Sequence, residues 1–347
     1  LGDGIELRLG GDARATQGRT KELYSFVAGT PTRQREAGGR TTTLGAFADA
    51  SFHVSDAMTL TGGARIDRWL IRDGFLREQV LATGLRVTDR EFGNRSGWEP
   101  TARAGIAFHA TPTLTLRAAS YLGWRLPTLN ELYRPYRVGA DSTAANAALR
   151  PERLKGVDGG VDFRPLPGLR LAATLFWNRL DHAIANVTLA PNSLMRQNLD
   201  AVRSRGAEVE AALALGRWNL GASYAYTDAR VRASGAALAL DGLRPAQTPH
   251  HQASATLGWQ APRGILASTT LRYVGRQYDD DQNQDVLHAA LTVDASLAVP
   301  VVRGFAIELR GENLGNRRVE TGISGADIVE RATPRTLWIG LRYEAPR

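Results

Sequence analysis

Strict two-residue alternation is the feature that most limits what this chain can fold into. In the segment LHAALTVDASLAV, residues 287–299, every second side chain is apolar, and mostly polar residues lie between. Successive side chains of a β-strand point to opposite faces, so this pattern predicts a strand with one oily face. About fourteen such runs, each about nine to fourteen residues long, follow one another along the 347 residues. Strands of soluble sheets average five or six residues, whereas a tilted strand needs about ten to cross a bilayer.

The connections between the runs alternate between short and long. The short ones lie at 55–57, 110–113, 165–168, 216–217, 261–264 and 301–304, and the long ones at about 14–40, 73–98, 128–151, 187–203, 232–249, 278–286 and 319–332. A β-sandwich has no reason to gather its long loops at one end, but outer-membrane barrels join their strands by short periplasmic turns and long external loops. The sequence therefore predicts an all-β fold, the wall of an antiparallel transmembrane β-barrel.

The hydrogen-bonding needs of the backbone favour the same fold. In hydrocarbon every N–H and C=O needs a partner, so a spanning sheet must close on itself, with apolar side chains toward lipid and polar ones toward a wet lumen. Aromatic residues fall near strand ends, where the interface girdles of such a barrel require them. These are Phe52, Phe108, Trp177, Trp218, Tyr226, Trp259, Tyr273 and Tyr343. The alternative is a β-sandwich core filled by these rings, which predicts shorter loops and a more aliphatic interior.

Composition excludes other classes. The chain has no cysteine, which excludes disulfides and thiolate metal sites, and no apolar run long enough for a transmembrane helix. The formal charge is +8, from 43 Lys and Arg against 35 Asp and Glu, and it suits nucleic acid, the phosphates of lipopolysaccharide or an acidic ligand. The basic residues are spread along the chain rather than gathered in one tract, so we expect no nucleic-acid partner.

No residue pattern points to catalysis or to a bound metal. The nucleophile-elbow motif of hydrolases is absent, and none of the 6 histidines has a metal ligand's spacing to another. His53, His109 and the pair His250–His251 are expected at wet strand ends. The acidic stretch YDDDQNQD, residues 278–285, partly matches a calcium loop but lacks its glycine and terminal glutamate, which favours a solvated loop over a cation site. We therefore expect neither an enzyme nor a cofactor.

The stretch from 123 to 152 carries a family resemblance. It reads Gly-Trp-Arg-Leu-Pro at 123–127, Thr-Leu-Asn-Glu-Leu-Tyr at 128–133 and Leu-Arg-Pro-Glu at 149–152. This order resembles the central signature of TonB-dependent outer-membrane receptors, where a Gly-Phe-Arg-Ala-Pro box precedes Thr-Leu-x-Glu-Leu-Tyr and Leu-x-Pro-Glu opens the next strand. Trp124 and Leu126 depart from the family's Phe and Ala. The matched positions, expected to be structural, are Gly123, Pro127, Glu131, Pro151, Glu152, Asn313, Pro334 and Arg335.

Other motifs follow in the family's order. RSRGAEVEAAL at 203–213 and TPHHQASATL at 248–257 resemble two of its strand openings, and the stretch from Glu312 to Tyr343 resembles its last two strands. The resemblance covers about 41–345 and implies an outer-membrane receptor for TonB-energised uptake of a scarce large nutrient, such as a ferric siderophore or cobalamin. Haem-uptake members carry a histidine within the central signature. No histidine occurs between 110 and 181, which counts against haem.

The family's plug domain and TonB box have no counterpart in this sequence, and the family's barrel has about twenty-two strands. We therefore expect residues 1–347 to be a single domain, the C-terminal part of a barrel whose plug and first strands lie outside it. TonB would act through that plug. Strand counting places the C-terminus in the periplasm, and we expect a monomer in contact with outer-membrane lipid and lipopolysaccharide. Two alternatives remain: a complete fourteen-stranded porin-like channel, and a soluble all-β binding protein.

Any ligand contacts in this part of the chain are expected on the long loops, because loops on a rigid scaffold carry binding. The loop after residue 123 offers rings and cations that suit a large, partly anionic, conjugated ligand such as an iron chelate. These candidates are Trp124, Arg125, Tyr133, Arg134, Tyr136 and Arg137. The alternative is that Pro127 and Glu131 shape this loop and brace it against the lumen wall.

Overall fold

One antiparallel sheet makes up most of the molecule. The computed structural model describes residues 4–302, 304–324 and 328–344. Fourteen strands follow a single path, in which each strand pairs with the next one along the chain. They are β1 (Ile5–Val27), β2 (Thr30–Ser55), β3 (Met58–Val80), β5 (Arg95–Thr111), β6 (Leu114–Arg125), β9 (Glu152–Leu166), β10 (Leu169–Asp181), β13 (Ala201–Leu215), β14 (Trp218–Arg232), β15 (His251–Gln260), β16 (Leu266–Val274), β19 (Ala290–Val302), β20 (Phe305–Glu312) and β23 (Thr336–Tyr343). The predicted all-β fold and its number of strands are confirmed.

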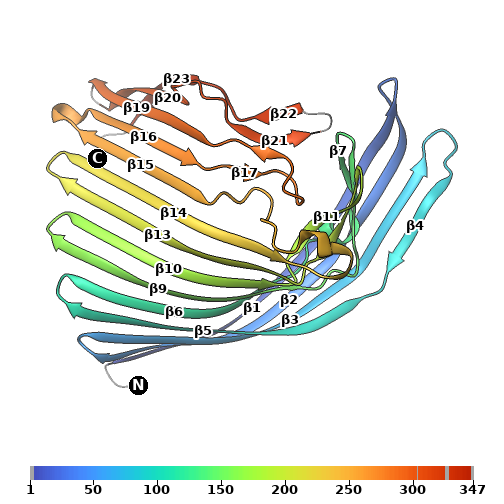
Figure 1. Ribbon diagram of the computed structural model, residues 1–347, viewed down its shortest axis with the longest axis horizontal. Coiled ribbons are helices and arrows are strands. Elements are labelled where there is room, and N and C mark those ends of the chain that lie inside the picture. Colours follow the sequence, from blue (N-terminus) through green and yellow to red (C-terminus); the bar gives the residue numbers. More distant parts are fainter. Residues whose placement is uncertain (1–3, 303, 325–327, 345–347) are drawn as a thin grey trace.

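The sheet is a curved wall whose two sides, where the strands end, differ (Figure 1). Tight turns join the strand ends on one side, drawn at the left, and the extended strands and long connections gather on the other side. We call these the short-turn side and the long-loop side. Gly168 and Gly216 have positive φ in two of the tight turns, a conformation that side chains other than glycine rarely adopt. Within the described residues no ladder joins β23 back to β1.

Smaller elements fill the connections. Most lie on the long-loop side; η2 lies in a turn on the other. They are β4 (Arg86–Phe92), which pairs with β3; α1 (Leu129–Tyr133), β7 (Tyr136–Val138), β8 (Asp141–Ala144), β11 (Ile184–Ala190), β12 (Ser193–Asn198), η1 (Gly235–Leu240), η2 (Pro262–Gly264), β17 (Gln277–Tyr278), β18 (Val286–Leu287), β21 (Glu320–Ser324) and β22 (Ile328–Arg331). No helix in the part of the chain that the structure describes is long and apolar enough to span a membrane.

Two predicted long connections are wrong in detail. Residues 14–40 are not a loop, because β1 and β2 continue as a paired hairpin up to Val27 opposite Thr30. Within 73–98, β3 runs on to Val80 and β4 folds back against it. Charged side chains occupy both faces of these extensions, so no apolar period marks them as strands. Parts of the connections predicted at 301–304 and 319–332 lie outside the described residues, at 303 and 325–327.

The strand register joins apolar side chains into continuous rows on one face. Leu271 on β16 lies between Ala255 on β15 and Val293 on β19, and Leu309 lies between Leu297 and Ile339 in the same way. These rows form a belt of exposed hydrophobic residues. We call the face of the sheet that carries this belt the outward face, and the opposite face of the sheet the inner face. The run from 287 starts as a strand only at Ala290, because Leu287 pairs with Gln277 in the small β17–β18 hairpin.

The inner face is polar in the same register. Thr270 lies between Thr256 and Asp294, and Ser254 lies between Ser223 and Arg272. Hydroxyl-to-hydroxyl hydrogen bonds join Ser223 to Ser254 and Thr256 to Thr270, each at 2.9 Å. A polar face of this kind suits a wet lumen, and the apolar face suits lipid.

Aromatic residues border the apolar belt on both sides. The eight rings expected in the girdles are all exposed. Trp218 stacks on Trp259 near the short-turn side, with ring centroids 5.8 Å apart, and Tyr226 lies eight residues further along the same strand, β14. The eight steps between Trp218 and Tyr226 span about 27 Å of strand. That length suits the apolar band of an outer-membrane barrel, which is about 25 Å tall.

Candidate functional site

The candidate site is the connection from β6 to β9, residues 126–151, which we call the signature loop. Its helix α1 begins with a capping box at Thr128. The Glu131 N–H donates to Thr128 Oγ1 at 3.2 Å, and the Thr128 N–H donates to the Glu131 carboxylate at 2.6 Å. Such reciprocal bonds satisfy backbone donors at a helix start. The short helix is therefore fixed by its own sequence, Thr-Leu-Asn-Glu.

The helix packs on the inner face of β2 and β3. Leu132 and Tyr133 are buried in one cluster with Trp69, Ile71 and Leu149. Trp69 and Ile71 alternate with the outward-facing residues of β3, so the cluster lies on the lumen side of the wall. Tyr133 is only 2% exposed.

A glycine in the wall makes room for this packing. A Cβ atom on Gly74 would lie 2.3 Å from Tyr133 Cζ, which is too close for any side chain larger than hydrogen. The wall is therefore shaped to receive Tyr133.

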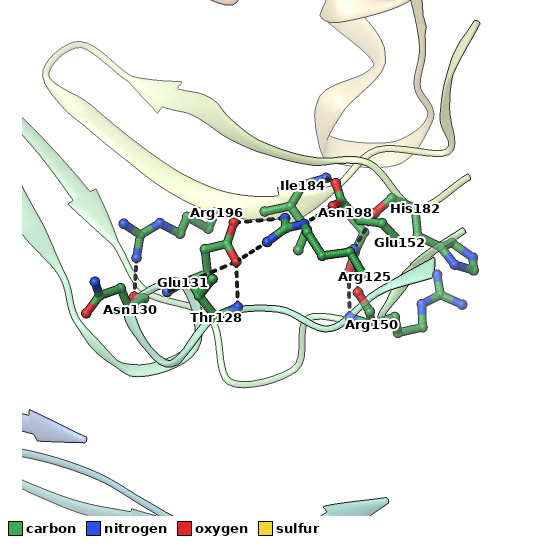
Figure 2. A network of polar contacts seen from close by, with 10 residues as sticks. All are labelled: Arg125, Thr128, Asn130, Glu131, Arg150, Glu152, His182, Ile184, Arg196 and Asn198. Carbon is green, nitrogen blue, oxygen red and sulfur yellow. Dashed lines mark hydrogen bonds and ion pairs between the residues drawn. The ribbon is translucent and has the colours of Figure 1, made fainter. Parts of the chain in front are cut away.

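An ion-pair network holds the base of the signature loop (Figure 2). Arg125 donates to both carboxylate oxygens of Glu131, at 2.9 and 3.0 Å, and also pairs with Glu152. The exposed side-chain fractions are 44% for Arg125, 21% for Glu131 and 9% for Glu152. Glu152 in turn accepts the N–H of Ile184 at 2.7 Å, which ties the start of β11 to the same network.

The charge of Glu131 is stabilised at this position. Burial by itself raises the pKa of this carboxyl, but hydrogen bonds from Arg125 and from Thr128 outweigh that effect. Its pKa therefore lies below the ordinary value, and Glu131 carries its negative charge at neutral pH.

Further along, guanidinium groups clamp the backbone of the loop. Arg196 on β12 donates to the carbonyls of Asn130 and Arg134 at the two ends of α1, and Figure 2 shows it beside Asn130. Arg95 on β5 donates to the carbonyls of Ala147 and Leu149, at 2.5 and 2.8 Å. The side chains of Asn146 and Asn198 make further bonds to backbone groups. The loop is thus fixed to the wall along most of its length.

Sequence reasoning missed these clamps. Arg196 and Asn198 come from another connection, and Arg95 opens a strand. Each meets the signature loop only through the tertiary fold. No spacing in the sequence relates them to it.

Half of the predicted ligand contacts are engaged in bracing. Trp124 donates its indole N–H to buried Asp67 at 2.9 Å, Arg125 sits between its two glutamates, and Tyr133 is in the core. The alternative role, that Glu131 and Pro127 shape and brace the loop, matches this geometry, since Pro127 is also fully buried.

The other three predicted contacts lie farther along the loop. Arg134 pairs with Glu22 on β1. The Tyr136 hydroxyl accepts a hydrogen bond from Asn186 at 2.8 Å, and Arg196 lies over the Tyr136 ring at 4.8 Å. Arg137 is exposed, and its side chain donates a hydrogen bond to the nearby carbonyl of Gly139. Ligand contact by any of the six residues stays a prediction.

The motif positions near the end of the chain lie in turns beside β20 and β23. Asn313 follows β20 with φ of 48° and brackets Arg317, accepting its N–H and donating to its carbonyl. The carbonyl of Pro334 accepts from Thr336, and the N–H of Arg335 donates to Asn316 just before β23. Pro151 is buried before β9, and Gly123 lies against Leu154.

The acidic stretch at 278–285 connects loops. Asp281 accepts both the N–H and the hydroxyl of Thr188 on β11, at 3.0 and 2.9 Å. Asp279 accepts the N–H of Ile323 on β21 at 2.7 Å, and Asp280 accepts backbone N–H groups of its own turn. These carboxylates accept hydrogen bonds from N–H and O–H donors of neighbouring connections. This arrangement favours a role in holding the connections together over a role in cation binding. The described residues contain no group of three or more His, Asp or Glu that could hold a metal ion.

Comparisons with known proteins give the family. A family model described as TonB dependent receptor-like, beta-barrel matches residues 1–314. The ferrioxamine receptor of Yersinia enterocolitica is 24% identical over 182 residues, which cover 50% of this chain and 25% of that protein.

Solved structures share the fold at low identity. The ferric yersiniabactin uptake receptor FyuA of Yersinia pestis superposes with a TM-score of 0.79 at 18% identity, over 99% of this chain and 52% of that one. The copper transporter OprC gives 0.75 at 18% identity over 99% and 54%, and the ferric-catecholate import receptor Fiu of E. coli gives 0.74 at 17% identity over 98% and 52%. The chain thus spans about half the length of these structures and a quarter of the curated relative. It belongs to the β-barrel family of TonB-dependent receptors.

Proposed function

We propose that this chain forms part of the wall and mouth of an outer-membrane receptor that takes up a ferric siderophore or a cobalamin-like nutrient. Uptake would be energised by TonB acting through a plug domain in the barrel. Family membership and the similarity to a ferrioxamine receptor support this role. The protein would work as a monomer without chemical catalysis, with its long loops outside the cell and its C-terminus in the periplasm.

The observation that carries the proposal is the signature loop, which is anchored firmly on the inner face at the long-loop side. A passive pore needs an open lumen, whereas a selective receptor needs a fixed set of contacts at its entrance. Farther along the loop, Tyr136 offers a partly exposed ring and Arg137 an exposed cation. Such groups suit a large ligand with aromatic or anionic oxygen donors, as iron chelates have.

The porin-like alternative receives less support. A passive channel requires a closed wall, because unpaired strand edges are costly in lipid. Within the described residues the edges of β1 and β23 are not joined. A fourteen-stranded pore built from this chain alone would leave those edges unsatisfied.

Iron uptake tests the proposal. Cells that make the whole protein should accumulate ⁵⁵Fe from at least one of ferrioxamine or a ferric catecholate, or should accumulate labelled cobalamin, and deletion of TonB should abolish that uptake. Replacing Tyr136 and Arg137 together by alanine should weaken ligand binding about tenfold, as expected for the loss of a ring and a cation worth about 1–2 kcal/mol. The control is Arg217→Ala, in a turn on the short-turn side. Uptake that persists without TonB would instead establish a passive channel.

A further inference from the structure

Two connections build a small sheet on the long-loop side of the wall. The signature loop contributes β7 and β8, and the connection from β10 to β13 contributes β11 and β12. The strands lie in the order β11, β12, β8, β7, and β8 and β12 are parallel. Figure 1 labels β7 and β11 close together on this side. We call these four strands the mouth sheet.

The side chain of Tyr136, one of the predicted ligand contacts, depends on the far edge of this sheet. Its backbone belongs to β7 at one edge, but its hydroxyl accepts a hydrogen bond of 2.8 Å from Asn186 in β11 at the other edge. Arg196 lies directly opposite Asn186 on β12, with its guanidinium 4.8 Å from the centre of the Tyr136 ring. The position of the ring is therefore set by where β11 and β12 lie.

Asp281 of the acidic stretch holds the free edge of β11. Thr188 is two residues beyond Asn186, so the two side chains project from the same face of the strand. Asp281 accepts the N–H of Thr188 at 3.0 Å and its hydroxyl at 2.9 Å. An edge strand lacks a neighbour for such N–H groups, and bonds to a carboxylate are stronger than bonds to a neutral acceptor. Glu152 fixes the start of β11 at Ile184, and Asp281 fixes the strand beyond Asn186.

The acidic stretch is in turn fixed by two further connections. Asn283 donates to the carbonyl of Arg244 and accepts its N–H, each at 2.9 Å, which joins the stretch to the connection from β14 to β15. Asp279 accepts the N–H of Ile323 at 2.7 Å, which joins it to the connection from β20 to β23. Asp281 thus ties the mouth sheet to a support that three connections share.

We propose that Asp281 is a positioning residue for the nutrient site. By holding Thr188 it keeps β11 and β12 against the Tyr136 ring, and so fixes the direction from which this ring meets an iron chelate with aromatic or anionic oxygen donors. The chemistry of the ligand rests on the proposed function, whereas the coupling of Asp281 to Tyr136 does not depend on any ligand. The inference assigns a role in binding to a connection that carries none of the predicted ligand contacts.

Nitration of tyrosine tests the coupling without a ligand. Tetranitromethane nitrates a tyrosine ring faster when the ring is more exposed and more mobile, and peptide mass spectrometry gives the rate at each tyrosine of the whole protein. Asp281→Ala should raise the rate at Tyr136 about tenfold, because the loss of two hydrogen bonds to a charged group lets β11 detach more often. Tyr133, which is buried in the same loop, should keep its rate and serves as the internal control.

Matched variants separate positioning from a general loss of structure. Asn186→Ala removes the bond to the Tyr136 hydroxyl directly and should raise the nitration rate to a similar level. Asp281→Asn keeps an acceptor oxygen and should fall between the parent and Asp281→Ala; it also provides the test if the alanine variant does not fold. Thr188→Val removes only the hydroxyl bond, so its effect should be smaller and should add nothing to that of Asp281→Ala. Glu91→Ala removes an exposed carboxylate on β4 and should match the parent.

Nutrient affinity gives a second readout. The probe is labelled ferrioxamine, ferric catecholate or cobalamin, whichever of them the uptake assay shows to enter the cell. Asp281→Ala should weaken its binding about fivefold, and should cause no further loss in protein that already carries Tyr136→Ala. Equal losses in both backgrounds would overturn the inference, because Asp281 would then act other than through Tyr136.

Two nitration results would also overturn the inference. Equal rates at Tyr136 in Asp281→Ala and Glu91→Ala would show that the hydrophobic cluster around Val187 holds β11 without Asp281. Faster nitration of Tyr133 together with Tyr136 would show that the whole signature loop had loosened. Either result would leave the proposed function intact if TonB-dependent uptake persists. The expected nitration rates in a protein that takes up none of the nutrients would contradict only the proposed function.

Discussion

Replacing Leu271 with arginine is expected to prevent stable assembly of the wall in a bilayer, whereas Thr270→Arg should be tolerated. Leu271 is 43% exposed on the outward face, midway along β16 and between Ala255 and Val293. An arginine near the bilayer midplane on the lipid face costs about 2–4 kcal/mol. That is a large fraction of the roughly 5–15 kcal/mol by which native proteins are stable.

Thr270 is the matched control because it is the adjacent residue on the other face. Its cross-strand partner Asp294 already pairs with Arg272, and the wet inner face can solvate a further arginine. Assembly is measured by refolding each variant into lipid vesicles and following protease resistance and the unfolding midpoint in urea. If Thr270→Arg were the more damaging change, the assignment of the two faces would be reversed.

The second large effect is expected from Arg125→Ala. The change leaves Glu131 and Glu152, which are mostly buried, without the cation they share. Breaking a buried ion pair by removing one partner costs about 3–5 kcal/mol, and the partial exposure of Arg125 reduces this to about 2–3 kcal/mol. The signature loop should then open about thirty- to 150-fold more often.

Hydrogen exchange of the amides between 126 and 151 measures that opening. The control is Arg137→Ala, which removes an exposed guanidinium bonded only to a nearby carbonyl and should leave exchange within about twofold of the parent. In a variant that also carries Glu131→Gln, the effect of Arg125→Ala should shrink, because less negative charge is left unpaired. Unchanged exchange in Arg125→Ala would show that the hydrophobic cluster around Tyr133 holds the loop without the ion pairs.

The wall could be predicted from sequence because lipid imposes a simple rule on it. Every second residue must be apolar where a strand crosses hydrocarbon, and this rule located the crossing strands and both girdles. The rule stops applying where strands leave the bilayer. The extension of β1 and β2 to Val27 and Thr30 was therefore missed, since charged residues occupy both of its faces and the part around Ala37 is buried against α1.

The signature loop could be predicted only in part. The capping box of Thr128 and Glu131 and the buried Pro127 are local features that the sequence carries. The clamps by Arg95 and Arg196 arise when the fold brings distant residues together.

The central claim, that apolar side chains face lipid while polar ones face the lumen, is tested most directly by site-specific labelling. The chain has no native cysteine, so Leu291→Cys and Thr292→Cys each introduce a single thiol. Leu291 is 53% exposed and lies opposite Tyr273, whereas Thr292 lies opposite Arg272. A thiol reagent confined to the membrane interior should label the cysteine at 291 and spare the one at 292. Labelling at 292 with protection at 291 would contradict the account.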